Sequence, residues 1–238
     1  MQFRSIQAVT DDRVYSINLP DKGVISLDGN SASKSYILTM ICTVLGLDYS
    51  STINKEAKGV LRTKASLGFL NGNLTLSDGS VTMRGKVPYI HCVYLNAESV
   101  GVSSFFISDI VKRNSIDIDM TRYTSDIEEK DWVRLLSLYN KYAGFESARI
   151  VTYPDGSKKL EFNGMTRELE TAYLLLSESF LTPSDYIRIV LIPELSYIDN
   201  NRLVELVRLM SHIRQLEMII IANDVDLSKN TFISSVSC

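Results

Sequence analysis

The chain has 238 residues, enough for one large α/β domain or for one domain that carries a small insert. Hydrophobic residues make up 45% and charged residues 22% of it, which is typical of a globular protein and excludes a disordered chain as the leading interpretation. The net charge of −3 excludes an overall basic field for nucleic acid, although a local basic face stays open.

The N-terminal quarter predicts short strands that lead into a buried helix. Strands are expected at 3–9, 14–19 and 24–27, with polar turns between them. A loop of small residues, 28–35, follows the third strand. Residues 36–47 are apolar on all sides and contain no helix breaker until Gly46, which indicates a helix buried all round.

The middle of the chain predicts an antiparallel, β-rich stretch. Residues 67–96 contain the hairpin-turn dipeptides Asn71-Gly72 and Asp78-Gly79 around an alternating segment. A short helix is expected at 100–111, and the charged residues 112–130 indicate a loop or an exposed segment.

The C-terminal half alternates helices and strands. Amphipathic or buried helices and apolar strands are expected in the following order: helix 131–143, a hairpin at 148–162 around Pro154-Asp155-Gly156, helix 166–181, strand 186–192, helix 200–214, strand 218–222 and a polar tail.

The loop 28–35 carries the chemistry that the sequence suggests. The P-loop pattern GxxxxGK[ST] lies between a strand and a helix, and Lys34 and Ser35 match its last two positions. Asp28 and Ser33 stand where that pattern has its two glycines. In a P-loop the lysine neutralises phosphate oxygens, the hydroxyl binds Mg²⁺, and backbone N–H groups cradle the phosphates. The structural alternative is a polar turn with an exposed lysine.

These segments together predict an α/β fold, a P-loop NTPase-like, mostly parallel sheet flanked by helices, with an antiparallel β-rich section in the N-terminal half. One domain over residues 1–238 is the simplest interpretation, with a β-rich or irregular insert at about 67–130.

Cysteine and histidine usage bears on metal sites and on the compartment. Cys42, Cys92 and Cys238 lie far apart and only two histidines are present, so no zinc-ligand spacing occurs. Free thiols suit a reducing cytoplasm. The sequence begins without the apolar core of a signal peptide and has no apolar run long enough for a bilayer, so we expect a cytoplasmic protein without membrane contact.

In their order and spacing, the terminal segments resemble the ATPase heads of the ABC superfamily, in particular the DNA-repair, chromosome-maintenance and defence ATPases. The phosphate loop of that group resembles G-x-N-G-S-G-K-S, so Asn30, Lys34 and Ser35 match, with Ser33 at its last glycine. The resemblance implies that Asn30, Ser33, Lys34 and Ser35 hold ATP, with Ser35 on Mg²⁺.

Two further segments are similar to motifs of the same family. Thr166 and Glu168 match the serine and glutamate of the signature segment L-S-x-G-E, and Arg167 takes the place of its glycine. After the strand 186–192, Glu194 is the only nearby carboxylate that could stand in for the family's catalytic glutamate, and a loop cap is the simpler interpretation of it. Asn223 or Asp224 stands where the family has its phosphate-sensing histidine.

The resemblance leaves three functions open. The first is an altered ABC-type head with weak or absent ATPase activity, acting as a structural or regulatory subunit of a homodimer or of a heterodimer with an ABC-type relative. By family analogy alone, it would serve a DNA-repair or genome-defence complex and meet nucleic acid through that complex. The second is a working ATPase that uses ATP, Mg²⁺, Lys34, Ser35 and Glu194. The third is a nucleic-acid-binding module without nucleotide.

Overall fold

The structure is a computed structural model, and it describes residues 3–9, 14–20, 23–45, 64–77, 80–96, 101–107, 127–181, 186–213, 217–226 and 229–238. Within these ranges the chain has an α/β fold with a six-stranded sheet, a five-stranded sheet and a two-stranded hairpin. No helix in the described ranges is both long and apolar enough to cross a bilayer.

A mostly parallel sheet forms the centre of the molecule. Its strand order is β13 (Ile233–Ser237), β3 (Gly23–Asp28), β12 (Glu217–Ile221), β11 (Ile187–Ile192), β7 (Ile90–Asn96) and β8 (Gly101–Ile107). The first five strands are parallel, and β8 runs antiparallel to β7. Every residue of β11 is buried, because a parallel strand covered on both faces has no solvent side. The predicted α/β class is confirmed.

The N-terminal half supplies a second, fully antiparallel sheet. Its strand order is β2 (Val14–Asn18), β1 (Phe3–Val9), β4 (Lys64–Phe69), β5 (Asn71–Ser77) and β6 (Ser80–Lys86). Alternation along these strands buries Ile6, Leu67 and Leu74 on one face. The predicted antiparallel section is thus confirmed. The β4–β5 turn lies one residue earlier than the sequence indicates, because Phe69 pairs with Gly72.

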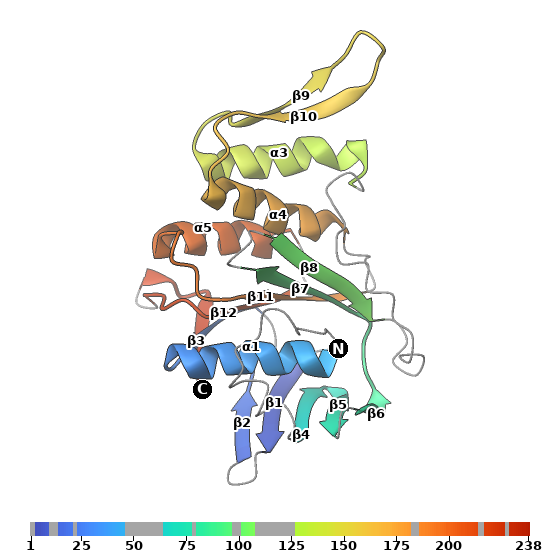
Figure 1. Ribbon diagram of the computed structural model, residues 1–238, viewed down its shortest axis with the longest axis vertical. Coiled ribbons are helices and arrows are strands. Elements are labelled where there is room, and N and C mark those ends of the chain that lie inside the picture. The colour runs from blue at the N-terminus through green and yellow to red at the C-terminus, as the bar shows by residue number, and fades with distance from the viewer. Residues whose placement is uncertain are drawn as a thin grey trace.

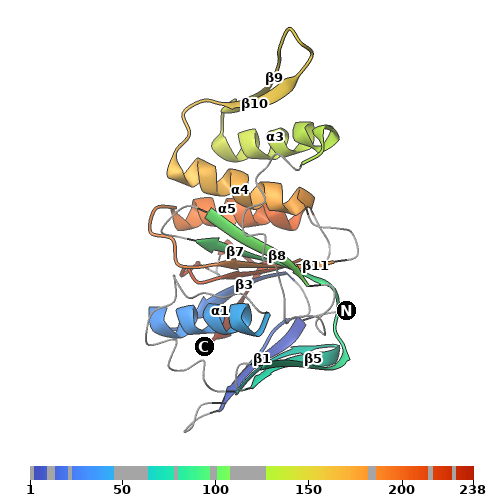
Figure 2. The same cartoon turned by 45° about the vertical axis from the view of Figure 1, so that its right-hand side comes forward.

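Helices cover both faces of the central sheet. Helix α1 (Ser31–Leu45) lies between the two sheets, as Figures 1 and 2 show. Helices α5 (Asn200–Ser211), α4 (Arg167–Leu181) and α3 (Glu129–Ala143) are stacked outward from the other face. The hairpin of β9 (Ala148–Thr152) and β10 (Lys158–Phe162) lies beyond α3 at the end of the molecule (Figure 1).

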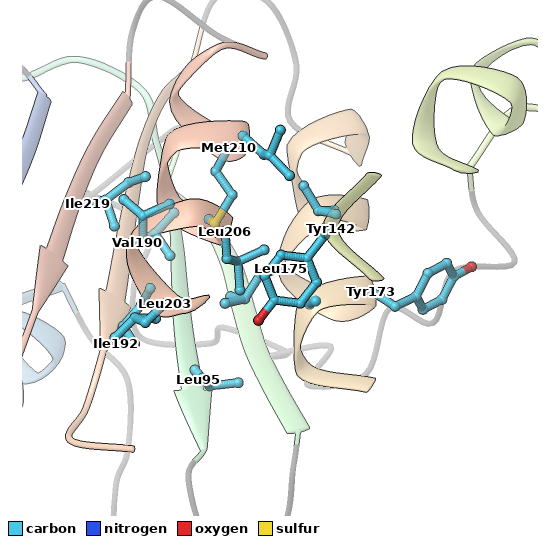
Figure 3. Packing of buried hydrophobic residues seen from close by; sticks show 14 of the residues in the cluster. Leu95, Tyr142, Tyr173, Leu175, Val190, Ile192, Leu203, Leu206, Met210 and Ile219 are labelled. Atoms are coloured by element: carbon cyan, nitrogen blue, oxygen red, sulfur yellow. The ribbon is translucent and has the colours of Figure 1, made fainter. Parts of the chain in front are cut away.

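Two hydrophobic cores follow from this layering. One lies between the two sheets and contains the buried side of α1. The other joins the central sheet to α3, α4 and α5; Figure 3 shows Leu203, Leu206 and Met210 of α5 facing Val190 and Ile219 of the sheet. The site described below lies at one edge of the central sheet, between α1 and α5, so both cores position it.

The helix predicted at 100–111 is wrong. Residues Gly101–Ile107 form strand β8, and its whole length pairs with β7. The segment is short and contains valine and phenylalanine, which favour strands, and periodicity alone does not separate a strand from a helix in so short a run. Of the loop predicted at 112–130, residues 112–126 lie outside the described residues, and α3 begins at Glu129.

Two other boundaries differ from the prediction. The first helix begins at Ser31 and not at residue 36, so part of the expected loop is helical. The tail predicted to be only polar contains strand β13, which pairs in parallel with β3. Its exposed serines hide the strand signal, because an edge strand buries few of its side chains.

Candidate functional site

Three loops meet at the carboxyl edge of the central sheet. They follow β3, β11 and β12, which are neighbours in the sheet and run parallel. In open α/β sheets this edge is where ligands bind. It brings together the loop residues Asn30, Ser33 and Lys34 with Glu194 and Asp224, although the last two are distant in sequence.

The start of α1 is closed by Asn30. Its side-chain oxygen accepts a hydrogen bond from the Ser33 amide at 2.8 Å, and its carbonyl accepts one from the Lys34 amide at 3.1 Å. This is ordinary N-capping, and it satisfies amide groups at the start of the helix. The connection from β3 to α1 is therefore reduced to Gly29 and Asn30.

Lys34 is buried and paired within the chain. Its side chain is 3% exposed, and its ammonium group forms an ion pair with the carboxylate of Asp224, whose side chain is 79% exposed. A buried charge needs a partner because desolvation is costly. In a nucleotide-binding P-loop that partner is phosphate, whereas here it is a carboxylate from the loop after β12.

Glu194 is held against the start of α1. The Ser31 hydroxyl donates a 2.8 Å hydrogen bond to Glu194 Oε2. The neighbouring Asn223 side chain bonds both backbone groups of Leu195, and Asn200 donates to the Asp224 carbonyl at 2.6 Å. These contacts fix the loops after β11 and β12 against each other, and so they set the positions of Glu194 and Asp224.

Strand β13 brings Cys238 to the same edge. The Cys238 amide donates to the Asp28 carbonyl at 2.9 Å. A Cβ atom on Gly29 would lie 2.9 Å from both the carbonyl oxygen and Sγ of Cys238, so this close approach requires glycine. Burial raises the pKa of the Cys238 thiol, Asp28 adds to this rise, and Lys34 opposes it.

Ser35 and the signature-like residues complete the predicted set. Ser35 is exposed on α1, and its role as a Mg²⁺ ligand stays a prediction. Thr166 caps α4, because its hydroxyl accepts from the Leu169 amide at 3.2 Å. Glu168 accepts from the Tyr142 hydroxyl at 2.9 Å and from Arg202 at 3.0 Å. The structure therefore places Thr166 and Glu168 in contacts within the helical layer.

Hydrogen bonds join three side chains, those of Glu168, Tyr142 and Arg202, into one cluster. Arg202 also donates to the Tyr142 carbonyl at 2.6 Å, and its guanidinium lies 4.0 Å from the centre of the Tyr142 ring. Burial raises the pKa of the Tyr142 hydroxyl strongly, and its bond to Glu168 raises it further. Burial lowers the pKa of Arg202, but Glu168, Tyr142 and Glu205 outweigh that effect, and the net shift is upward.

Arg167 also points back into the helical layer. Its guanidinium carbon lies 4.2 Å from the centre of the Tyr197 ring, a cation–π contact that ties the start of α4 to the loop after β11. The Tyr197 hydroxyl in turn lies 3.1 Å from the hydroxyl of Thr171. The residue that replaces the signature glycine thus contributes to packing between α4 and that loop.

The residues at the carboxyl edge do not fit ATP with Mg²⁺. A phosphate-binding loop needs free backbone N–H groups and an available lysine, whereas Asn30 uses the Ser33 and Lys34 amides and Asp224 pairs with Lys34. The exposed carboxylates of Asp28, Glu194 and Asp224 surround this edge and would repel a triphosphate.

Comparison with known proteins gives a structural match. The chain superposes on a crystal structure of an SMC head bound to the C-winged helix domain of ScpA, with a TM-score of 0.56 and 12% sequence identity. The match covers 94% of this chain and 90% of that chain. The chain has the fold of an SMC head, an ABC-type ATPase head. No protein-family model and no curated protein sequence matches it.

Two residues at the carboxyl edge of the central sheet were not predicted from the sequence. Cys238 reaches the edge through the pairing of β13 with β3, for which the tail carries little signal. Ser31 was expected in a loop, and its bond to Glu194 depends on the early start of α1. Asn30 itself gives a usable hint to the early start of α1, since asparagine is a good N-cap residue.

Proposed function

We propose that the chain is an ABC-type head that binds ATP weakly or not at all, does not hydrolyse it efficiently, and acts as a structural or regulatory subunit. The ion pair between buried Lys34 and Asp224 is the observation that carries this proposal. A nucleotide would have to break that pair and the Asn30 cap before phosphate reached the lysine. Its binding energy would be reduced by the cost of both changes.

Loss of hydrolysis follows from the same edge. ATP hydrolysis in P-loop enzymes depends on electrostatic stabilisation by lysine, Mg²⁺ and a residue that orients water, and removing one contributor costs about 10²–10³ in rate. Here the lysine faces a carboxylate of its own chain and the Asp28 side chain adds negative charge beside it. Several contributors are therefore weakened together.

A role in assembly is the function that such a head retains. The SMC head that this chain matches is described as bound to a winged-helix domain of another protein. We infer by analogy that this chain pairs with a second head, either its own copy or an ABC-type relative, in a complex that serves DNA repair or genome defence.

Calorimetric titration of the purified chain with Mg-ATP tests this proposal, with hydrolysis followed in the same samples. We expect no saturation below millimolar ATP and no release of phosphate above that of a Lys34→Ala variant. Tight binding that disappears in Lys34→Ala would overturn the proposal, because it would show that the loop still holds phosphate through this lysine.

A working ATPase is the second candidate, and one contact favours it. Glu194 follows β11 and lies next to the loop through its 2.8 Å bond from Ser31, which is where a water-orienting carboxylate is needed. Under this alternative, a Glu194→Gln variant would keep ATP affinity and lose turnover by at least about tenfold. Equal, negligible turnover in both proteins supports the non-hydrolysing head.

A further inference from the structure

The outer face of the five-stranded antiparallel sheet carries a group of polar side chains. Because side chains alternate along a strand, the residues that flank buried Ile6, Leu67 and Leu74 point to the opposite face. Those outward residues include Gln7, Ser66 and Asn73, which are hydroxyl or carboxamide side chains. This face lies on the far side of the sheet from α1, the helix that contains Lys34 (Figures 1 and 2).

A shallow hollow of about 410 Å³, largely open to solvent, lies on this face. Four paired residues, one from each of β1, β4, β5 and β6, form a row across the hollow. Ser5 pairs with Gly68, Gly68 with Asn73 and Asn73 with Arg84. A Cβ atom on Gly68 would lie 2.3 Å from Ser5 Oγ, so the Ser5 side chain packs over Gly68 in this row. The polar side chains that line it are Ser5, Gln7, Ser66, Asn71, Asn73 and Arg84.

The charge of this sheet differs in sign from that of the whole chain. Its described residues, 3–9, 14–18, 64–77 and 80–86, include Arg4, Lys64, Arg84 and Lys86 and contain no aspartate or glutamate. The chain as a whole has a net charge of −3. The described part of the sheet therefore carries a local positive field, and a bound anion at Arg84 would meet no opposing carboxylate from these residues.

The lining selects one class of ligand. An arginine guanidinium binds phosphate through two parallel hydrogen bonds, and carboxamides and hydroxyls suit the hydroxyl groups of a sugar. The ring of Phe69 is buried beneath the hollow, so it offers no surface on which a base would stack. We propose that this hollow is a binding site for a sugar phosphate, with Arg84 on the phosphate and Asn71 and Asn73 on the sugar.

A sugar phosphate has two sources, a free metabolite or the backbone of a nucleic acid. Ribose 5-phosphate, titrated by calorimetry or by NMR shifts, is the probe for a free metabolite. A short fluorescent DNA duplex is the probe for a nucleic-acid backbone. In both cases Arg84→Ala is expected to weaken binding at least about tenfold, and Arg84→Lys to recover only part of it, because lysine lacks the planar pair of donors. Circular dichroism checks that the exposed substitution leaves the fold intact.

Two control variants separate the outcomes. Lys64 is exposed on the same sheet but does not line the hollow, so Lys64→Ala leaves ribose 5-phosphate binding unchanged and weakens a duplex in a salt-dependent way. We expect Lys34→Ala to leave the binding of both ligands unchanged, because the hollow is separate from the edge that carries the proposed function. Failure of both ligands to bind at millimolar concentration, or binding that Arg84→Ala does not weaken or Lys34→Ala abolishes, would overturn the inference.

Discussion

At Lys34, the ion pair with Asp224 is the feature on which the proposed loss of nucleotide binding rests. The lysine side chain keeps the position that the P-loop pattern predicts, at the start of a buried helix, yet its ammonium group faces Asp224. Predicting the lysine was possible because strand, small-residue loop and helix follow one another in sequence. Predicting the carboxylate as its partner was not, because that pairing depends on the placement of the loop after β12.

Removing the charge of Asp224 tests the importance of that pair for stability. We expect Asp224→Asn to lower the free energy of unfolding by about 1–2 kcal/mol, less than for a fully buried pair because the Asp224 carboxylate is exposed and screened. Asp226→Asn is the matched control, since Asp226 pairs with Lys229 on the surface. Urea denaturation measures both variants, and equal losses would contradict a special role for the buried lysine.

The raised pKa of the Tyr142 hydroxyl predicts how the free energy of unfolding depends on pH. Its pKa in the folded chain lies well above the ordinary value of 10.0, so the folded chain keeps a proton that the unfolded chain releases. The contribution of this hydroxyl to the free energy of unfolding is therefore fully present below about pH 10 and falls as the pH rises further. We expect Tyr142→Phe to lose about 1 kcal/mol at neutral pH and to show a shallower decline at about pH 11.

Urea denaturation across this pH range measures the effect. Tyr153→Phe serves as the control, because Tyr153 is an exposed residue of the β9–β10 connection and lies outside the cluster of Tyr142, Glu168 and Arg202. Parallel declines of the wild type and Tyr142→Phe above pH 10 would contradict the assigned role of the Tyr142 hydroxyl.

The helices and buried strands were predictable from sequence, and the exposed edges were not. Strand β11 is apolar except for Arg188, β12 is apolar after Glu217, and α4 starts at a threonine cap, so each has a strong local signal. Strand β8 is a short edge strand whose identity comes from pairing with β7. Strand β13 is similar, since only its position beside β3 makes it a strand.

Thr166 provides a test at the level of one helix. Its hydroxyl caps α4, so Thr166→Ala is expected to lower stability by about 1 kcal/mol, whereas Thr166→Ser keeps the cap and most of the stability. Thermal unfolding monitored by circular dichroism measures both variants. If alanine and serine have the same effect, the cap does not stabilise α4 and the hydroxyl of Thr166 has another use.

Across the whole molecule, the arrangement of layers is that of an SMC head although sequence identity is 12%. Hydrophobic patterning and the order of strands and helices were sufficient to predict this class, because they determine which faces must be buried. The chemistry at the carboxyl edge follows from a few side chains instead. Function depends on the site and not on the fold, so this fold does not by itself imply nucleotide binding.

We propose that the side chains of residues 28–35 and Asp224, and not the fold, prevent nucleotide binding. In the family loop G-x-N-G-S-G-K-S, glycines stand at the positions of Asp28, Ser31 and Ser33. A chain with Asp28→Gly, Ser31→Gly and Ser33→Gly restores these glycines, and Asp224→His in the same chain restores the family's histidine and removes the partner of Lys34. Calorimetric titration with Mg-ATP is predicted to give binding at least about tenfold tighter than in the wild type. Binding of Mg-ATP by the wild type as tight as by the restored chain would contradict the account.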